Sequence, residues 1–290
     1  MKSHIPTLLL REWMQHKLGW LIAAFAPPLL FLGMLPFGHM DGTPTIPAEL
    51  IAVIVLVACG CVVYAICLMV ALFQLPGLAR RDAQDRSIEF WLSLPGRPSE
   101  SVVSTVLAHA WLAPVGGAIV GTLFGLPIAL TGLGLKLGWG DAFGLHWGEV
   151  LSAALPVLLR GMAGTVLLTV WLLPVIMVLM AASAWFKRLG APLVLVGGAV
   201  ATAVMHNVYG IDWPLNAVQD LNLHINHSLL YDARELMRIL QSNTETSLVA
   251  TMVTDLGHSL AELASVSFVG WMAVAAAGFA LVVMKRTRGA

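Results

Sequence analysis

The stretch LIAVIVLVACGCVVYAICLMVALFQL, from Leu50 to Leu75, contains no charged residue and decides the fold class. A membrane-spanning helix needs about 20 predominantly apolar residues to cross roughly 30 Å of hydrocarbon. Helices and closed barrels alone satisfy their backbone hydrogen bonds in that medium, and a continuous apolar run is typical of a helix. The stretch therefore predicts a transmembrane helix.

Further apolar runs of comparable length occur along the chain, at about residues 19 to 38, 102 to 131, 162 to 185, 190 to 208 and 264 to 284. The chain is 58% hydrophobic and only 11% charged, with a mean hydropathy of +0.84. Because the runs recur rather than standing once near the start, a removable signal peptide does not account for them. We predict an all-α polytopic membrane protein with six transmembrane helices in a single domain, residues 1–290.

Two of the runs are irregular. The third exceeds the bilayer thickness and contains Pro114 and Gly116, so we expect it to be strongly tilted or broken there. The fourth is preceded by Arg160, and an arginine at mid-bilayer costs about 2.5 to 3.5 kcal/mol on insertion scales. Arg160 therefore indicates an interface, with residues 150–159 forming a short interfacial helix before the fourth span.

The distribution of basic residues predicts the orientation, because Lys and Arg are enriched in cytoplasmic loops. Twelve of the 16 Lys and Arg residues lie on the side of the two termini; the other four are Lys136, Arg160, Arg234 and Arg238. We therefore expect both termini, and the loop after the second run, to be cytoplasmic. The net charge of +0 suggests no nucleic-acid partner.

Two segments outside the spans are patterned. Residues 1–18 alternate apolar side chains such as Leu9 and Trp13 with polar ones such as Arg11, which predicts an amphipathic helix on the cytoplasmic face or a simple basic flank. Residues 76–100 form the most charged stretch of the chain. Its helical spacing and its aromatic residues favour a docking element for a partner protein, and an ordinary solvated loop is the alternative.

The loop reads D85-R-S-I-E-F-W-L-S-L-P95, followed by PSESVVST. It resembles the segment that joins the second and third spans in permease subunits of type-2 ATP-binding-cassette (ABC) transporters. In that family the segment docks as a coupling helix on a separate ATPase, and the N-terminal helix makes a second contact. The resemblance implies ATPase-coupling roles for Asp82, Asp85, Arg86, Ser87, Glu89, Phe90 and Trp91, and secondary contacts for Arg11 and Glu12.

The resemblance further implies a transport subunit, not an enzyme, in the bacterial inner membrane. The sequence contains no GxxxxGK[ST] phosphate loop, so ATP and Mg²⁺ would be bound by the partner ATPase and the chain itself would hold no cofactor. A second permease subunit, in the simplest case a homodimer, and membrane lipid are the other expected partners. Apolar walls that include Met177 and Met180 favour an apolar or amphipathic substrate, such as a lipid, peptide or drug-like molecule.

Residues 209–262 form a long external segment between the last two spans. Its periodicity predicts two helices, near residues 229–241 and 245–260. His224 and His227 are spaced to share one helix face, but no carboxylate or thiol stands at a metal-binding spacing from them. Hydrogen-bonding histidines are therefore the expectation, and no metal site is predicted.

Three other classes compete with the exporter hypothesis. A membrane-embedded hydrolase would need ionisable residues in the spans, where His109 is the clearest candidate, and the HExxH and GxSxG motifs do not occur. An ion-coupled secondary transporter agrees with the Gly- and Pro-interrupted spans but not with their lack of carboxylates. A non-transporting membrane assembly subunit is the third class.

Overall fold

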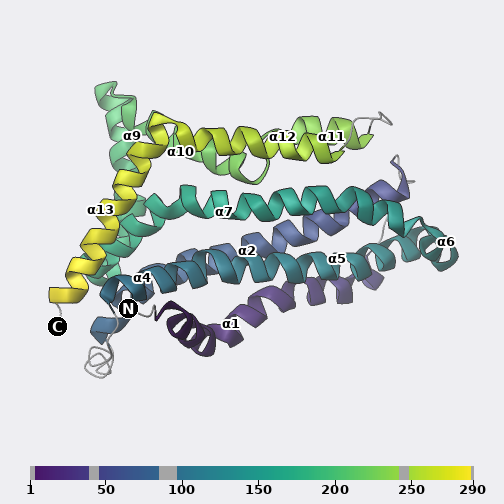
Figure 1. The fold of residues 1–290 in the computed structure, drawn as a ribbon, viewed down its shortest axis with the longest axis horizontal. Coiled ribbons are helices and arrows are strands. Elements are labelled where there is room, and N and C mark those ends of the chain that lie inside the picture. The colour runs from purple at the N-terminus through teal and green to yellow at the C-terminus, as the bar shows by residue number, and fades with distance from the viewer. Residues whose placement is uncertain (1–3, 39–45, 85–96, 242–247, 289–290) are drawn as a thin grey trace.

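The computed structural model describes residues 4–38, 46–84, 97–241 and 248–288, and these residues form helices and turns without a strand (Figure 1). The α-helices are α1 (Ile5–Met34), α2 (Ala48–Gln84), α4 (Pro98–Val106), α5 (Ala113–Leu137), α6 (Trp139–Gly144), α7 (Trp147–Phe186), α8 (Gly190–Pro192), α9 (Gly198–Tyr209), α10 (Trp213–Leu229), α11 (Ala233–Gln241), α12 (Leu248–Ala261) and α13 (Val266–Arg288). Short 3₁₀ turns are η1 (Leu35–Phe37), η3 (Lys187–Leu189) and η5 (Glu262–Ala264), and π turns are η2 (Leu107–Leu112) and η4 (Leu193–Gly197).

Within the described residues, five helical stretches are long and apolar enough to cross a membrane: Ile5–Phe37, Ala48–Arg80, Pro98–Leu137, Trp147–Tyr209 and Val266–Thr287. Many large apolar side chains on them point outward, among them Leu18, Phe73 and Leu123, each more than two-thirds exposed. An apolar surface of this extent is stable in contact with lipid and not in water. The chain is thus an all-α polytopic membrane protein, as the sequence predicts.

The long helices α1, α2, α5 and α7 run side by side along the long axis of the molecule (Figure 1). Glycines of α5 bring it close to α2: a Cβ on Gly125 would lie 2.8 Å from the Leu56 Cα, and one on Gly121 would overlap the Cys59 carbonyl. Small residues four apart allow such close approach of membrane helices. Helices α2 and α5 are therefore a closely packed pair within the bundle.

The third predicted run is unbroken. Helix α4 continues through the π turn η2 into α5, and Pro114 stands in the first turn of α5. Proline has no N–H for the carbonyl four residues earlier, and a local π turn is one way a helix accommodates it. Gly117, Gly121 and Gly125 of this run pack against α2.

The fourth and fifth predicted runs fall within one continuous stretch, Trp147–Tyr209. The separate interfacial helix predicted at residues 150–159 is wrong, because these residues are part of α7, which is 40 residues long. The chain turns after α7 at Lys187, whose φ is 55°. Gly190 then lies against the Ala182 carbonyl, where a Cβ would not fit.

The segment of residues 209–262, which the sequence predicts to be external, contains one helix more than expected. Helices α11 and α12 match the two predicted helices within a few residues, whereas α10 was not predicted. Helices α10 and α12 lie along α7, and α13 crosses the end of α7 where the C-terminus lies (Figure 1). The segment is therefore packed against the bundle.

Candidate functional site

Most residues of the predicted coupling element lie outside the described part of the chain. Asp82 belongs to the last turn of α2, and Asp85, Arg86, Ser87, Glu89, Phe90 and Trp91 lie outside the described residues. Their coupling roles stay predictions. Helix α4, which follows this loop, belongs to the described residues, and its contacts with other helices are known.

The beginning of α4 lies at the same end of the molecule as the N-terminus and the C-terminus (Figure 1). The Arg286 guanidinium of α13 donates a hydrogen bond to the Ser101 hydroxyl of α4, with Nη1 and Oγ 3.1 Å apart. The Thr105 hydroxyl of α4 donates to Glu12 Oε1 of α1 at 3.1 Å. Helices α1, α4 and α13 are thus joined by side chains at this end.

Glu12 is completely buried, although the sequence placed it on the polar face of an exposed helix. Its Oε1 accepts a hydrogen bond from Arg11 Nη2 at 2.7 Å as well as the one from Thr105. Around it Leu10, Trp13 and Met14 point outward. In a bilayer the apolar face of a helix contacts lipid and the polar face turns toward the protein, which explains this orientation.

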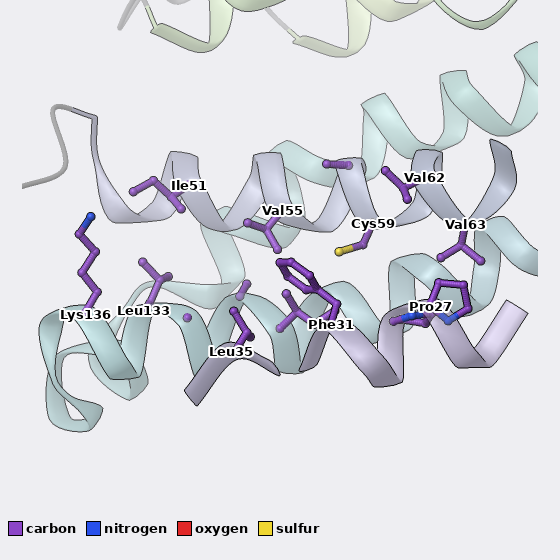
Figure 2. Close-up of a pocket in the computed structure, with 15 residues that line it drawn as sticks. Pro27, Phe31, Leu35, Ile51, Val55, Cys59, Val62, Val63, Leu133 and Lys136 are labelled. Carbon is purple, nitrogen blue, oxygen red and sulfur yellow. The ribbon is translucent and has the colours of Figure 1, made fainter. Parts of the chain in front are cut away.

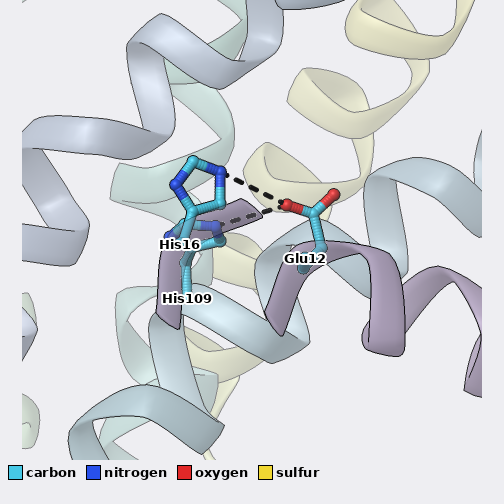
Figure 3. A group of neighbouring side chains, drawn as sticks. All are labelled: Glu12, His16 and His109. Atoms are coloured by element: carbon cyan, nitrogen blue, oxygen red, sulfur yellow. Dashed lines mark ion pairs between the residues drawn. The ribbon is translucent and has the colours of Figure 1, made fainter. Parts of the chain in front are cut away.

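Two histidines approach the other carboxylate oxygen of Glu12 (Figure 3). The Oε2 atom lies 3.4 Å from His109 Nε2 and 3.8 Å from His16 Nε2. His109 is fully buried and stands in the π turn η2, a kind of irregularity that often occurs at functional sites. Glu12, His16 and His109 are referred to below as the Glu–His cluster.

A cavity of about 510 Å³ lies between α1, α2 and α5 and extends to Lys136, near the end of α5 (Figure 2). That end of α5 lies opposite the termini (Figure 1). Its walls are apolar side chains, including Phe31, Val55 and Leu133. Lys136 is the one charged residue among the described residues that line it. An apolar cavity with a single cation at its edge suits an amphipathic molecule that carries negative charge.

A second polar network holds α10 and α12 on α7. Arg160 is 3% exposed, and its Nε lies 2.7 Å from Asp255 Oδ2 of α12. It also donates to the Ser228 carbonyl at 2.9 Å and to the Ser259 hydroxyl at 2.6 Å. Asp255 in turn accepts from the Tyr231 backbone N–H at 3.0 Å. Arg160 therefore lies at a buried junction between α7, α10 and α12.

His224 and His227 of α10 share a carboxylate next to this junction. Glu262 accepts hydrogen bonds from Nδ1 of His224 at 2.8 Å and Nδ1 of His227 at 2.7 Å. The histidines are thus hydrogen-bonded, as expected. Sequence reasoning missed Asp255 and Glu262, because the spacing along the chain gives no sign that either meets its partner.

Comparisons with protein-family models, curated proteins and solved structures find no match to this chain.

Proposed function

We propose that this chain is the membrane-spanning permease subunit of an ATP-driven exporter, similar to the type-2 ABC transporters, with its ATPase on a separate polypeptide. It moves an apolar or amphipathic substrate out of the cytoplasm of a bacterium. Both termini and the loop 76–100 face the cytoplasm, and a second copy of the permease completes the pathway.

The observation that carries the proposal is the joining of α1, α4 and α13 at the end where the charged loop returns to α4. An ATPase bound to the loop would move the beginning of α4, and the bonds Thr105–Glu12 and Arg286–Ser101 would pass that movement to the first and last helices. Coupling of this kind needs contiguous packed elements between the two sites. The loop sequence D85–P95 supplies the family resemblance.

Six spans are part of the proposal. The stretch Trp147–Tyr209 has 63 residues and would be about 95 Å long as a straight helix, about three times the thickness of the hydrocarbon. Its turn at Lys187, one of the basic residues assigned to the cytoplasm, divides it into two spans. With two spans here, an even number results and both termini fall on one side.

The cavity beside Lys136 favours the hypothesis that the substrate is amphipathic. It lies between the first three spans and, in the proposed orientation, in the outward-facing half of the protein. A substrate leaving the pathway could hold its apolar part there while an acidic group meets Lys136.

Co-purification tests the proposal. The tagged chain is expressed with the ATPases of its host, purified in mild detergent and compared with Asp85→Ala/Arg86→Ala/Trp91→Ala. A Glu235→Ala/Arg238→Ala variant, altered in the exposed external helix α11, is the matched control. We expect a nucleotide-binding subunit with the wild type and the control and not with the triple variant. The proposal fails if no ATPase accompanies the wild type.

An ion-coupled secondary transporter is the second candidate, and one observation favours it. The expected lack of buried carboxylates is wrong, since Glu12 is fully buried beside His109 and Asp255 is 8% exposed. Buried ionisable groups in a bundle commonly mark ion pathways. This function predicts transport in vesicles that is driven by an ion gradient and needs no ATPase.

A further inference from the structure

We propose that Glu12, His16 and His109 form a binding site for a divalent transition-metal ion, with Zn²⁺ as the best-fitting ion. The ion would join α1 to the π turn η2 of the third stretch. This inference concerns the chain alone and does not depend on the presence of an ATPase.

The spacing of the three side chains fits a metal better than hydrogen bonds. The distances from Glu12 Oε2 to the two Nε2 atoms, 3.4 and 3.8 Å, exceed the usual N–H···O range of about 2.7 to 3.2 Å. Tetrahedral zinc with bonds of about 2.0 to 2.1 Å has ligand atoms about 3.3 Å apart. The three ligand atoms all lie within 4.8 Å of one another, so a small closing movement brings them to this geometry.

The burial of His109 points to a ligand. His109 is 0% exposed, and neither of its ring nitrogens has a hydrogen-bond partner among the described residues. A buried polar group without a partner costs about 1 to 3 kcal/mol, so such groups call for an explanation. A metal ion bound to Nε2, which faces Glu12 and His16, removes this cost for that atom.

The fold holds the ligands in place. Glu12 and His16 are four residues apart on α1 and share one face of the helix. The His109 ring packs edge-on against Trp20 and His16, with centroids 4.9 and 4.7 Å apart. Fixed rings of this kind reduce the ordering that binding requires.

Two contacts orient the Glu12 carboxylate. Arg11 and Thr105 donate to Oε1, and Oε2 faces the histidines (Figure 3). Two imidazoles and a carboxylate are ligands that zinc accepts, with water in the fourth position. Because Arg11 already balances the carboxylate charge, we expect binding weaker than that of closed four-ligand structural sites.

Metal titration of the purified full-length chain tests this inference. The protein is stripped with chelator in detergent and titrated with Zn²⁺ by calorimetry, and with Co²⁺ while the visible d–d absorption of the bound ion is recorded. We expect one strong site per chain in the wild type. His16→Ala/His109→Gln should weaken binding by roughly tenfold or more and abolish the Co²⁺ absorption.

The control variant is His224→Gln/His227→Gln, which removes the other histidine pair and its contact with Glu262. It should keep the wild-type affinity. If His109→Gln fails to fold, His16→Ala alone serves, because that side chain stands at the edge of the cluster and is 23% exposed. The inference is overturned if the wild type binds no Zn²⁺, if the His16 variant binds it as tightly as the wild type, or if the His224/His227 variant is the one that loses it.

Discussion

Arg160 is the residue on which the attachment of the external segment depends. It joins α7 to the end of α10 and to α12, and it lies beside Gly164, where a Cβ would come within 2.5 Å of the Ser228 carbonyl. Its charge is buried together with that of Asp255. Removing one partner of a buried ion pair leaves the other charge without compensation.

We therefore expect Arg160→Met to lower the free energy of unfolding by about 3 to 5 kcal/mol. Thermal unfolding in detergent, together with protease cleavage of the external segment, measures the loss. Arg238→Met is the control, since Arg238 forms an exposed pair with Glu235 whose loss should cost far less. Equal behaviour of the two variants would show that the Arg160 junction does not hold the segment.

The ion pair between Glu235 and Arg238 should depend on pH. Two hydrogen bonds from Arg238, 2.6 and 2.8 Å long, hold the pKa of the Glu235 carboxyl below its usual value. A depressed carboxyl pKa means that the pair is intact above that pKa and is lost as the pH falls through it. In NMR spectra of protein labelled at the glutamate carboxyl carbon, the Glu235 signal, assigned with Glu235→Gln, should titrate with a midpoint below the usual value for a glutamate carboxyl. Arg238→Gln should raise its midpoint, and an unchanged midpoint would contradict the predicted cause.

The sequence showed which charged residues were unusual, but it did not show which residues they pair with. The position of Arg160 in an apolar run indicated that the residue was unusual, but Asp255 lies 95 positions later and no local pattern connects them. Glu12 was predicted on the polar face of an amphipathic helix of residues 1–18, whereas it lies in α1, which continues to Met34, and its side chain is buried. The polar face was assumed to meet water, whereas α1 turns it toward Thr105 and His109.

At the scale of elements, the α2–α5 contact depends on glycines that have no room for a side chain. Gly121→Ala should destabilise the bundle by about 1 to 3 kcal/mol, because the new Cβ overlaps the Cys59 carbonyl. Gly116 is on the same helix, and a Cβ added there would meet nothing within 4 Å, so Gly116→Ala should be neutral or stabilising by about 0.5 to 1 kcal/mol. The free energy of unfolding of both variants is measured in mixed micelles. Equal changes in the two variants would mean that helix propensity, and not close packing, determines the effect of an alanine on α5.

Helices with long apolar runs were predictable, because length and composition alone specify them. Helix α10 was not, since residues 221–226 of its sequence WPLNAVQDLNLHINHSL alternate apolar and polar side chains, a period that is typical of a strand. Its stability comes from tertiary contacts with α7, including the Ser228 carbonyl held by Arg160. The periodicity of a segment does not predict a helix whose stability depends on contacts with residues far away in the sequence.

At the scale of the whole molecule, the bundle leaves a cavity between helices that expose many large apolar side chains. Helices α2 and α5 approach closely near Gly117 and Gly121, but together with α1 they leave space toward Lys136, where Phe31 and Leu35 line the opening (Figure 2). A space of about 510 Å³ beside a hydrocarbon phase fills with an acyl chain or with substrate. The charge of Lys136 then selects among the available headgroups.

The purified chain should therefore retain anionic phospholipid in preference to zwitterionic lipid. An attraction of about 1 kcal/mol per lysine near an anionic group corresponds to about a fivefold preference, and Lys136→Gln should remove it. Ala58→Phe, which places a ring in the cavity, should lower the retention of both lipids. Ala65→Phe adds the same ring to an exposed position of α2 that does not line the cavity, so it should leave retention unchanged. Native mass spectrometry of the four proteins from vesicles of equal lipid composition measures these occupancies. Equal retention by the Ala58 and Ala65 variants would mean that the lipid sits elsewhere, and the cavity would then lose its assignment to an amphipathic molecule.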